Sequence, residues 1–193
     1  MNLENIDAII EQLSSMVEIK VNDIPDIDLY MDQVTTFIEN KLGREKREKK
    51  DKLLTKTMIN NYSKAKILTP SKNKKYNKQQ MIQLILIYYL KQVLSIGDIH
   101  DLFKPLFENE SKNENLINDI YNSFLSFKKD SMKSVSNMLE EMTALIAGAT
   151  DNKSAQENED VQMLLTVLML ASQAQACKRA AEAIIDNYFK PHL

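Results

Sequence analysis

The sequence predicts a mainly α-helical protein with one small β-hairpin. The 193 residues include only three glycines and four prolines, too few for the series of tight turns that an all-β fold needs. Leu, Ile, Met, Lys, Glu and Gln are plentiful, and apolar residues recur at helical spacing along most of the chain. A hydrophobic fraction of 44% beside a charged fraction of 27% predicts a globular chain with a buried core.

Two helices and a connector are predicted before residue 43. Apolar residues at helical spacing from Leu3 onwards predict an amphipathic helix that ends near Ile19. Residues 21–28 contain Pro25 and predict a connector, because proline disfavours helix in the residue before it. Asp26 or Asp28 can cap a second helix. Its apolar stripe comprises Leu29, Val34, Phe37, Ile38 and Leu42, and it stops at Gly43.

A lysine-rich segment and a short helix come next. Residues 44–52 contain no apolar residue and predict a mobile arm or a solvated helical extension. Thr55 can cap a third helix, which ends before the sequence Thr-Pro-Ser at 69–71. Residues 71–76 then predict a tiny hairpin in which Asn73 takes the left-handed conformation. The buried side of the third helix comprises Met58, Ile59, Tyr62, Ala65 and Ile67.

The second half of the chain predicts longer helices. Asn77 can cap a helix that is apolar over most of its circumference, as a central helix should be. Ser95 and Asp98 have the spacing of a capping box and open a helix whose length Pro105 limits.

Two long helices are expected to complete the chain. The apolar stripe from Leu116 to Ile146 predicts one continuous helix, and the polar stretch 150–160 separates it from a last helix over 161–189. Together they predict a long antiparallel helical hairpin that leaves apolar surface for a partner. Self-association is the usual way to cover such a surface.

Charge is concentrated in one block. Residues 1–40 hold one lysine and nine acidic residues, residues 41–78 hold fourteen basic and three acidic residues, and the remainder has a net charge of −5. The middle block therefore carries +11 within a chain of net charge −2. A dense basic block predicts contact with nucleic acid or another anionic surface. The alternative is a solvated lysine-rich loop.

Composition excludes several classes of protein. The glycines lie too far apart for a phosphate-binding loop or a dinucleotide fingerprint. One cysteine, Cys177, and two histidines, His100 and His192, cannot form a thiolate zinc site or a disulfide. We therefore expect no metal, no cofactor, no catalytic residues and no enzymatic activity, and we expect Cys177 to pack in a core.

The chain also lacks the signals of export and membrane insertion. The first residues are acidic rather than basic, and the most apolar stretch, 161–171, is shorter than a membrane span. A cytoplasmic protein without a membrane segment is the expectation.

A resemblance to a known family rests on residues 55–103. The order there is short helix, basic loop, buried helix and capped helix, written TKTMINNYSKAKIL, TPSKNKKYNKQQM and IQLILIYYLKQVLSIGDIHDLF. These segments resemble the winged helix-turn-helix DNA-binding domain of the mercury-resistance regulator (MerR) family. The features that match are the apolar pair Ile67-Leu68, the proline and basic wing, Tyr76, and the Ser-capped helix with Asp98 and Ile99. The stretch from about Ile24 to Phe103 is also similar to an uncharacterised bacterial family of unknown function.

The resemblance implies a homodimeric transcriptional regulator that binds double-stranded DNA. The amphipathic helix of residues 1–23 would precede a MerR-like winged helix-turn-helix domain over 24–108, and residues 109–193 would form a helical dimerisation or effector region. Asn60 and Asn61 would face the major groove, where asparagine can pair with adenine. Tyr62 would lie beside the DNA backbone, and the lysines would meet phosphates. The residues implied to contact DNA are Lys56, Thr57, Asn60, Asn61, Tyr62, Lys64, Lys66, Lys72, Lys74, Lys75 and Lys78.

The sequence departs from the family pattern at several positions. Asn60 replaces a common arginine, Asn61 a tyrosine and Lys66 a glycine, the wing has no glycine, and the lysine-rich insert 44–52 replaces a tight turn. These departures favour an alternative, a helical protein–protein interaction module on a winged-helix scaffold that no longer binds DNA. An enzyme ranks third, because no acid–base pair or nucleophile arrangement stands out.

Overall fold

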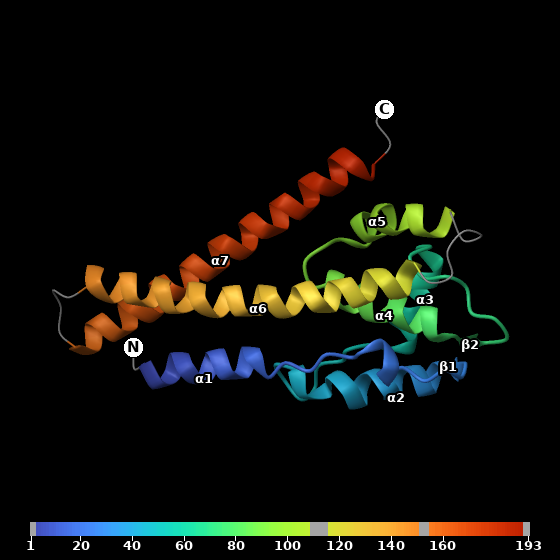
Figure 1. The fold of residues 1–193 in the computed structure, drawn as a ribbon, viewed down its shortest axis with the longest axis horizontal. Helices are drawn as coiled ribbons and strands as arrows, with labels where there is room; N and C mark the ends of the chain where they lie inside the picture. The colour runs from blue at the N-terminus through green and yellow to red at the C-terminus, as the bar shows by residue number, and fades with distance from the viewer. Residues whose placement is uncertain (1–2, 109–115, 151–154, 191–193) are drawn as a thin grey trace. The chain divides into compact units, whose positions relative to one another are not determined.

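The protein is mainly helical with one small antiparallel sheet, which confirms the predicted fold class (Figure 1). The computed structural model describes residues 3–108, 116–150 and 155–190. The strands in these ranges are β1 (Leu29–Tyr30) and β2 (Lys75–Tyr76), and 3-10 helices cover Val21–Asp23 and Gly43–Glu45. The α-helices of these ranges are α1 (Leu3–Ser14), α2 (Met31–Leu42), α3 (Lys56–Lys64), α4 (Lys78–Leu90), α5 (Ile96–Glu108), α6 (Leu116–Ala149) and α7 (Ala155–Tyr188).

The chain folds as two compact units. Unit 1 comprises Met1–Met16 and Ser126–Ala180, and unit 2 comprises Val17–Leu125 and Ala181–Leu193. Each unit combines two separate stretches of sequence, whereas the predicted regions 1–23, 24–108 and 109–193 are consecutive. Helices α6 and α7 each contribute to both units.

Helix α4 is the centre of unit 2. Its residues from Gln80 to Ile87 are all buried, as the apolar circumference predicts. Asn77 caps the helix: its Oδ1 accepts from the Gln80 N–H at 2.9 Å, and Gln80 Oε1 accepts from the Asn77 N–H at 2.9 Å. Around α4, the other elements of unit 2 add fully buried residues such as Val34, Ile59 and Ile99 to the same core.

The sheet joins two segments that are far apart in the sequence. β1 and β2 are antiparallel, with Leu29 opposite Tyr76 and Tyr30 opposite Lys75. Leu29 and Tyr76 are buried, while Tyr30 is exposed, so the strands alternate between core and surface. The sequence predicts only the local hairpin of residues 71–76, because the β1 pairing depends on tertiary structure.

Two predicted boundaries near the amino terminus are wrong. Helix α1 ends at Ser14 rather than near Ile19, because Ile19 is fully buried in the core of unit 2 and its carbonyl accepts from Tyr121 Oη at 2.6 Å. The residue at the cap position before α2 is Tyr30 rather than an aspartate: the Tyr30 N–H donates to Gln33 Oε1 at 2.8 Å. Gly43 caps the end of α2 as predicted.

Two boundaries in the second half also differ from expectation. Helix α5 opens at the predicted Ser95–Asp98 cap but continues through Pro105 to Glu108. Pro105 removes one backbone donor and its ring crowds the carbonyl of residue 101, yet the helix continues for three residues beyond it. Helix α7 begins at Ala155 instead of Val161, within the stretch predicted as a connector.

Unit 1 has a small core. Three buried residues, Ile6, Leu139 and Met142, form its cluster, and Ile10, Ile146 and Leu170 pack against it. Helix α6 is continuous, as the long apolar stripe predicts. Cys177 on α7 is exposed, so the prediction that it packs in a core is wrong.

Candidate nucleic-acid interface

Helix α3 presents one polar face to solvent. Thr55 caps it as predicted, with Oγ1 accepting from the Met58 N–H at 3.1 Å. Ile59 and Tyr62 anchor the opposite face in the core of unit 2. At 100° per residue, the exposed positions fall within about 140° of the helix circumference. These exposed residues are Lys56, Thr57, Asn60, Asn61 and Lys64.

A Schellman motif ends α3, and Lys66 occupies its left-handed position. The Ile67 N–H donates to the Tyr62 carbonyl at 3.1 Å, and the Lys66 N–H donates to the Ser63 carbonyl at 3.1 Å. Lys66 has a φ of 57°, in the left-handed region where this motif usually places glycine. Its side chain is exposed. The chain therefore holds an ammonium group at a position where a side chain is unfavourable.

The wing is a four-residue turn from Lys72 to Lys75. The Lys75 N–H donates to the Lys72 carbonyl at 2.9 Å, and the two residues form an antiparallel bridge. Asn73 and Lys74 have φ values of 53° and 61°, as a type I′ turn requires. The prediction for Asn73 is confirmed. Lys74 is a second lysine in the left-handed region, and both Lys72 and Lys74 are exposed.

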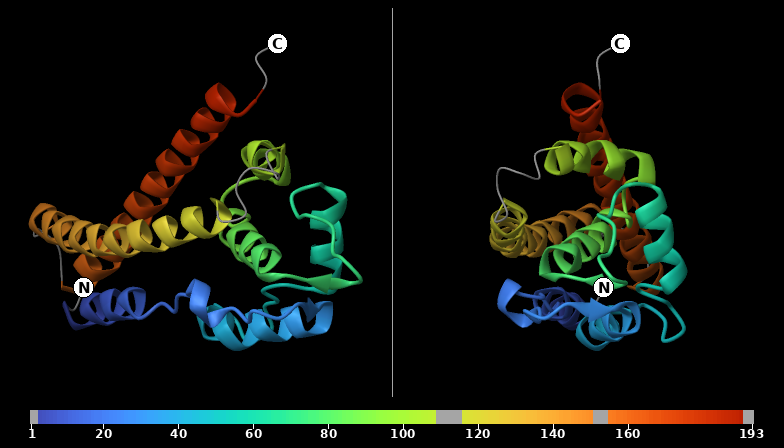
Figure 2. Two further views of the ribbon diagram at one scale, coloured as in Figure 1. Left: turned by 45° about the vertical axis from the view of Figure 1, so that its right-hand side comes forward. Right: turned by 90° about the vertical axis from the view of Figure 1, so that its right-hand side faces the viewer.

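Strand pairing holds the wing on unit 2. After the turn, Lys75 and Tyr76 pair with β1, and Tyr76 is buried. The Lys75 ammonium lies 4.9 Å from the centre of the Tyr30 ring, a cation–π contact. Both views of Figure 2 place α3 and this turn at the same end of unit 2.

Two buried glutamines of α4 fix the start of the wing. Gln83 Oε1 accepts from both the N–H and the Oγ1 of Thr69, each at 3.1 Å. Gln80 Nε2 donates to the carbonyls of Thr69 and Pro70 at 3.0 and 2.8 Å. Neither glutamine is among the residues that the sequence predicts for this site. Two glutamines within an otherwise apolar helix are the signal that could have found them, because a buried amide needs hydrogen-bond partners.

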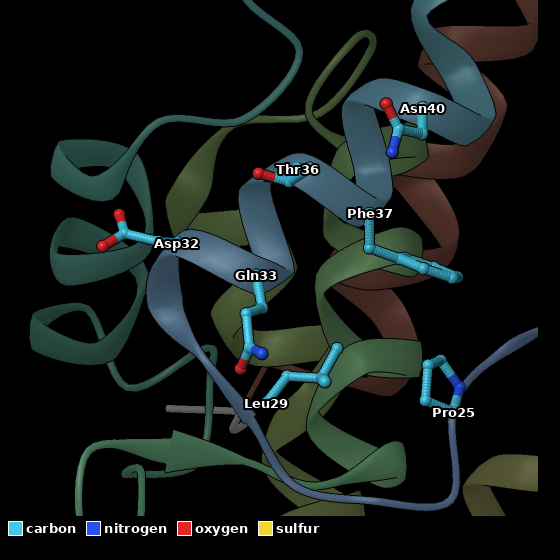
Figure 3. Close-up of a pocket in the computed structure, with 7 residues that line it drawn as sticks. All are labelled: Pro25, Leu29, Asp32, Gln33, Thr36, Phe37 and Asn40. Atoms are coloured by element: carbon cyan, nitrogen blue, oxygen red, sulfur yellow. The ribbon is translucent and has the colours of Figure 1, made fainter.

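Aspartates of the preceding segment neutralise two of the predicted lysines. Lys56 pairs with Asp32, and Lys78 Nζ lies 2.7 Å from Asp26 Oδ1. Asp32 is at the edge of a surface groove of about 390 Å³ whose apolar lining includes Pro25, Leu29 and Phe37. Figure 3 shows the Asp32 carboxylate directed away from these three side chains.

The lysine-rich segment 44–52 is part of unit 2 and is folded by contacts within itself and with α2. The Asp51 N–H donates to the Glu48 carbonyl at 3.0 Å, and Lys46 pairs with Glu39. Beyond it, Lys91 Nζ donates to the Leu53 carbonyl at 3.0 Å, and burial lowers the pKa of the Lys91 ammonium. The segment is thus a turn-rich connection, not a helical extension of α2.

The structure separates the eleven predicted DNA contacts into three sets. Lys75 and Lys78 are half-buried, and Tyr62 is 5% exposed and packs in the core, where burial raises the pKa of its phenol. Tyr62 therefore packs α3 against the core and does not extend from the polar face of the helix. Among the described residues, Lys64, Lys66, Lys72 and Lys74 have no acidic partner. The exposed set comprises Lys56, Thr57, Asn60, Asn61, Lys64, Lys66, Lys72 and Lys74.

Other chemistry is limited within the described ranges. No group of three or more His, Cys, Asp or Glu side chains there could hold a metal ion. His100 Nδ1 lies 3.1 Å from Asp101 Oδ1 on α5, at the surface of unit 2. No helix of the described segments is long and apolar enough to cross a membrane.

The fold and this surface define a mostly helical protein with a basic helix and turn at one end of unit 2. A family model described as a domain of unknown function, DUF1836, matches residues 19–124, more than half of the chain. The chain belongs to this family. No curated protein and no solved structure matches it. The matched residues correspond closely to the first stretch of unit 2, Val17–Leu125.

Proposed function

We propose that this protein is a DNA-binding transcriptional regulator of MerR-like winged helix-turn-helix type, acting in the cytoplasm. In this proposal α3 lies in the major groove and the turn Lys72–Lys75 meets the adjacent phosphate backbone. Asn60 and Asn61 on the outer face of α3 have the side chain that pairs with adenine. Lysines beside them fix the position of the helix on the duplex without reading its sequence.

The observation that carries the proposal is the presence of lysine at two left-handed positions. Lys66 and Lys74 both have positive φ and exposed side chains. An L-residue in this conformation costs roughly 1–2 kcal/mol, a cost that glycine avoids. The chain tolerates this strain just after α3 and again within the wing turn. A need for positive charge at these two positions explains why lysine stands there instead of glycine.

Phosphate binding predicts a strong salt dependence. The four lysines that have no acidic partner within the described part of the chain, Lys64, Lys66, Lys72 and Lys74, would give a slope of log K against log salt of about −4, and six phosphate contacts would give about −5. The ion pairs of Lys56 and Lys78 are exposed on at least one side. Exposed pairs contribute little stability, so these lysines can exchange an aspartate for a phosphate.

The test is a titration of labelled duplex DNA by fluorescence anisotropy at several salt concentrations. Reversing charge at Lys72 and Lys74 together (K72E/K74E) is expected to weaken binding by more than about tenfold and to flatten the slope by about two. The matched control is K129E/K133E, which makes the same charge change on exposed positions of α6. A flat salt response in the unmodified protein, or equal losses in both variants, contradicts the proposal.

Dimerisation through the carboxy-terminal helices is part of the proposal. Residues 161–177 of α7 carry no charge, yet within 161–171 only Thr166 is buried. A helix that is apolar on all sides is normally surrounded by other helices. A second copy supplies them in a symmetric assembly. The exposed apolar residues of unit 1 that it would cover include Phe127, Leu145, Met163, Leu164, Val167, Leu168 and Met169.

The alternative function is a helical protein–protein interaction module. The exposed apolar surface of α7 favours it, since such a surface can bind a different protein as well as a second copy. The two proposals make different predictions for duplex binding when the charge of the wing lysines is reversed. An interaction module predicts no salt-dependent duplex binding, whereas the DNA-binding proposal predicts that reversing the wing lysines removes duplex binding and leaves the oligomeric state unchanged.

A further inference from the structure

Unit 2 contains an apolar cavity beside the last turns of α4. Its volume is about 570 Å³, and its walls come from α4, the turn that follows it, α5, the first turns of α6 and the last turns of α7. This volume is in the range of sites that bind small organic molecules. The cavity is separate from the glutamines and lysines of the candidate nucleic-acid interface.

Aromatic rings supply much of the wall. Tyr89 of α4, Phe103 of α5, Phe124 of α6 and Phe189 beyond α7 all line the cavity. The Tyr89 and Phe124 rings lie 5.7 Å apart at a tilt of 53°, so two of these rings already pack together. No charged side chain lines it among the described residues, and the Tyr89 hydroxyl is the one polar side-chain group in its lining.

The end of α7 closes one side of the cavity. Ile185 is buried, and the Phe189 N–H donates to its carbonyl at 3.0 Å, which continues the helical path to the aromatic residue. Lys190 lies 3.7 Å from Asp98 at the start of α5 and 2.5 Å from Asp186. The first contact joins the residue that follows Phe189 to the start of α5, and the second lies within the carboxy-terminal end of α7 itself.

We propose that this cavity is a binding site for an uncharged, apolar small molecule with an aromatic or aliphatic body. Burying an ion against these walls would be strongly unfavourable, because no opposite charge compensates for its desolvation. An apolar molecule loses water on binding and gains contact with the rings of three helices and of Phe189. The inference goes beyond DNA binding and does not depend on it.

The mouth of the cavity provides sites for blocking variants. Val93 and Ile120 line it, and their side chains are 48% and 37% exposed. A tryptophan at either position can extend over the opening without replacing a buried core residue. Ile27, which is 70% exposed and lies outside the cavity, provides the matched control for adding a tryptophan to the surface of unit 2.

The experiment is a fluorescence titration of the full chain with the uncharged dye Nile red. One saturable site per chain is expected, with affinity reduced by about tenfold or more in Val93→Trp and in Ile120→Trp and changed less than about twofold in Ile27→Trp. Circular dichroism tests whether each variant is folded. If Val93→Trp does not fold, the affinity of Ile120→Trp decides the outcome. Absence of saturable binding overturns the proposal.

Two further outcomes separate the cavity from other apolar surfaces and define the ligand class. Equal binding by the unmodified protein and both mouth variants places the dye elsewhere, for example on the exposed surface of α7, and overturns the proposal. 1-Octanol is expected to displace Nile red at concentrations at which octanoate does not. Equal displacement by octanoate contradicts an uncharged ligand. No nucleic acid is present, so the result is independent of the DNA-binding proposal.

Discussion

The carboxamide oxygen of Gln83 accepts two hydrogen bonds from Thr69, one from its N–H and one from its hydroxyl, both at 3.1 Å. Thr69 begins the loop that carries the wing, and Gln83 is buried on the central helix α4. A single side chain thus fixes the base of the exposed turn on the most buried element of unit 2.

Replacing Gln83 by leucine is expected to lower the free energy of unfolding by about 1–3 kcal/mol. The change puts an apolar side chain of similar size in place of the amide and leaves the Thr69 N–H without its acceptor in a partly buried position. Urea denaturation measures the loss. Gln92→Leu, the same substitution at an exposed position after α4, is expected to change stability by less than about 0.5 kcal/mol. Equal effects would show that the Thr69 contact contributes nothing.

Replacing Lys66 or Lys74 by glycine is expected to stabilise the protein while weakening DNA binding. Removal of the side chain relieves strain at φ values of 57° and 61°, for a net gain of about 0.5–1 kcal/mol after the added freedom of the unfolded chain is counted. Thermal denaturation and duplex titration follow the two effects. Lys64→Gly removes the same charge from the last residue of α3, where glycine is unfavourable, and should destabilise instead. Tighter DNA binding by the glycine variants would count against the proposed interface.

Replacing Tyr121 by phenylalanine removes the hydrogen bond from Tyr121 Oη to the Ile19 carbonyl, 2.6 Å away. Both residues are fully buried, so the carbonyl loses its partner with no access to water, and a loss of about 1–3 kcal/mol is expected. Burial raises the pKa of the Tyr121 phenol, which therefore stays protonated as the donor. Tyr188→Phe, at an exposed position of α7, is the control and should be neutral in the same denaturation experiment.

Replacing Asp98 by asparagine is expected to destabilise the protein by about 0.3–1 kcal/mol at neutral pH, the usual value of a negative charge in the first turn of a helix. Hydrogen bonds from Ser95 hold the pKa of the Asp98 carboxyl below its ordinary value, and burial offsets part of that effect. A lowered pKa means that the contribution is complete above an ordinary aspartate pKa of about 4 and is lost as pH falls through the lower, folded-state value. The free energies of unfolding of the unmodified protein and of Asp98→Asn, measured by urea denaturation, should therefore converge as the pH falls from neutral to acid. Asp130→Asn makes the same substitution on the exposed surface of α6 and is the control.

Replacing Leu164 and Leu168 together by lysine is expected to convert a dimer into a monomer without unfolding the chain. These side chains are 60% and 55% exposed, one helical turn apart on α7, so charge is tolerated in a single chain but not between two uncharged helices. Light scattering after size-exclusion chromatography measures the mass. Leu145→Lys on α6 tests whether that side of unit 1 contributes. A monomeric unmodified protein would contradict the proposed assembly.

Local patterns predicted much of the fold, because their causes are local. Thr55, Asn77 and Ser95 cap helices at the predicted positions, since each capping bond spans only three residues. Asn73 has the predicted left-handed backbone for the same reason. The apolar stripe predicted α6 as one helix because its period is that of the helix itself.

Features that depend on distant contacts were not predictable from one sequence. The end of α1 is set by burial of Ile19 in another unit, and β1 forms only because β2 lies beside it. The anchoring roles of Gln80 and Gln83 require Thr69 and Pro70 to fold back on α4. In the candidate site, sequence predicted the exposed lysines and asparagines of α3, but the burial of Tyr62 and the aspartate partners of Lys56 and Lys78 follow from tertiary structure.

The exposed Cys177 provides a natural attachment site for a spectroscopic label. It is the single cysteine of the sequence, and it ends the uncharged part of α7. A spin label attached there modifies one site per chain without any substitution. Electron paramagnetic resonance can then measure the separation of two labels directly, and the same sample, mixed with duplex DNA, reports whether that separation changes.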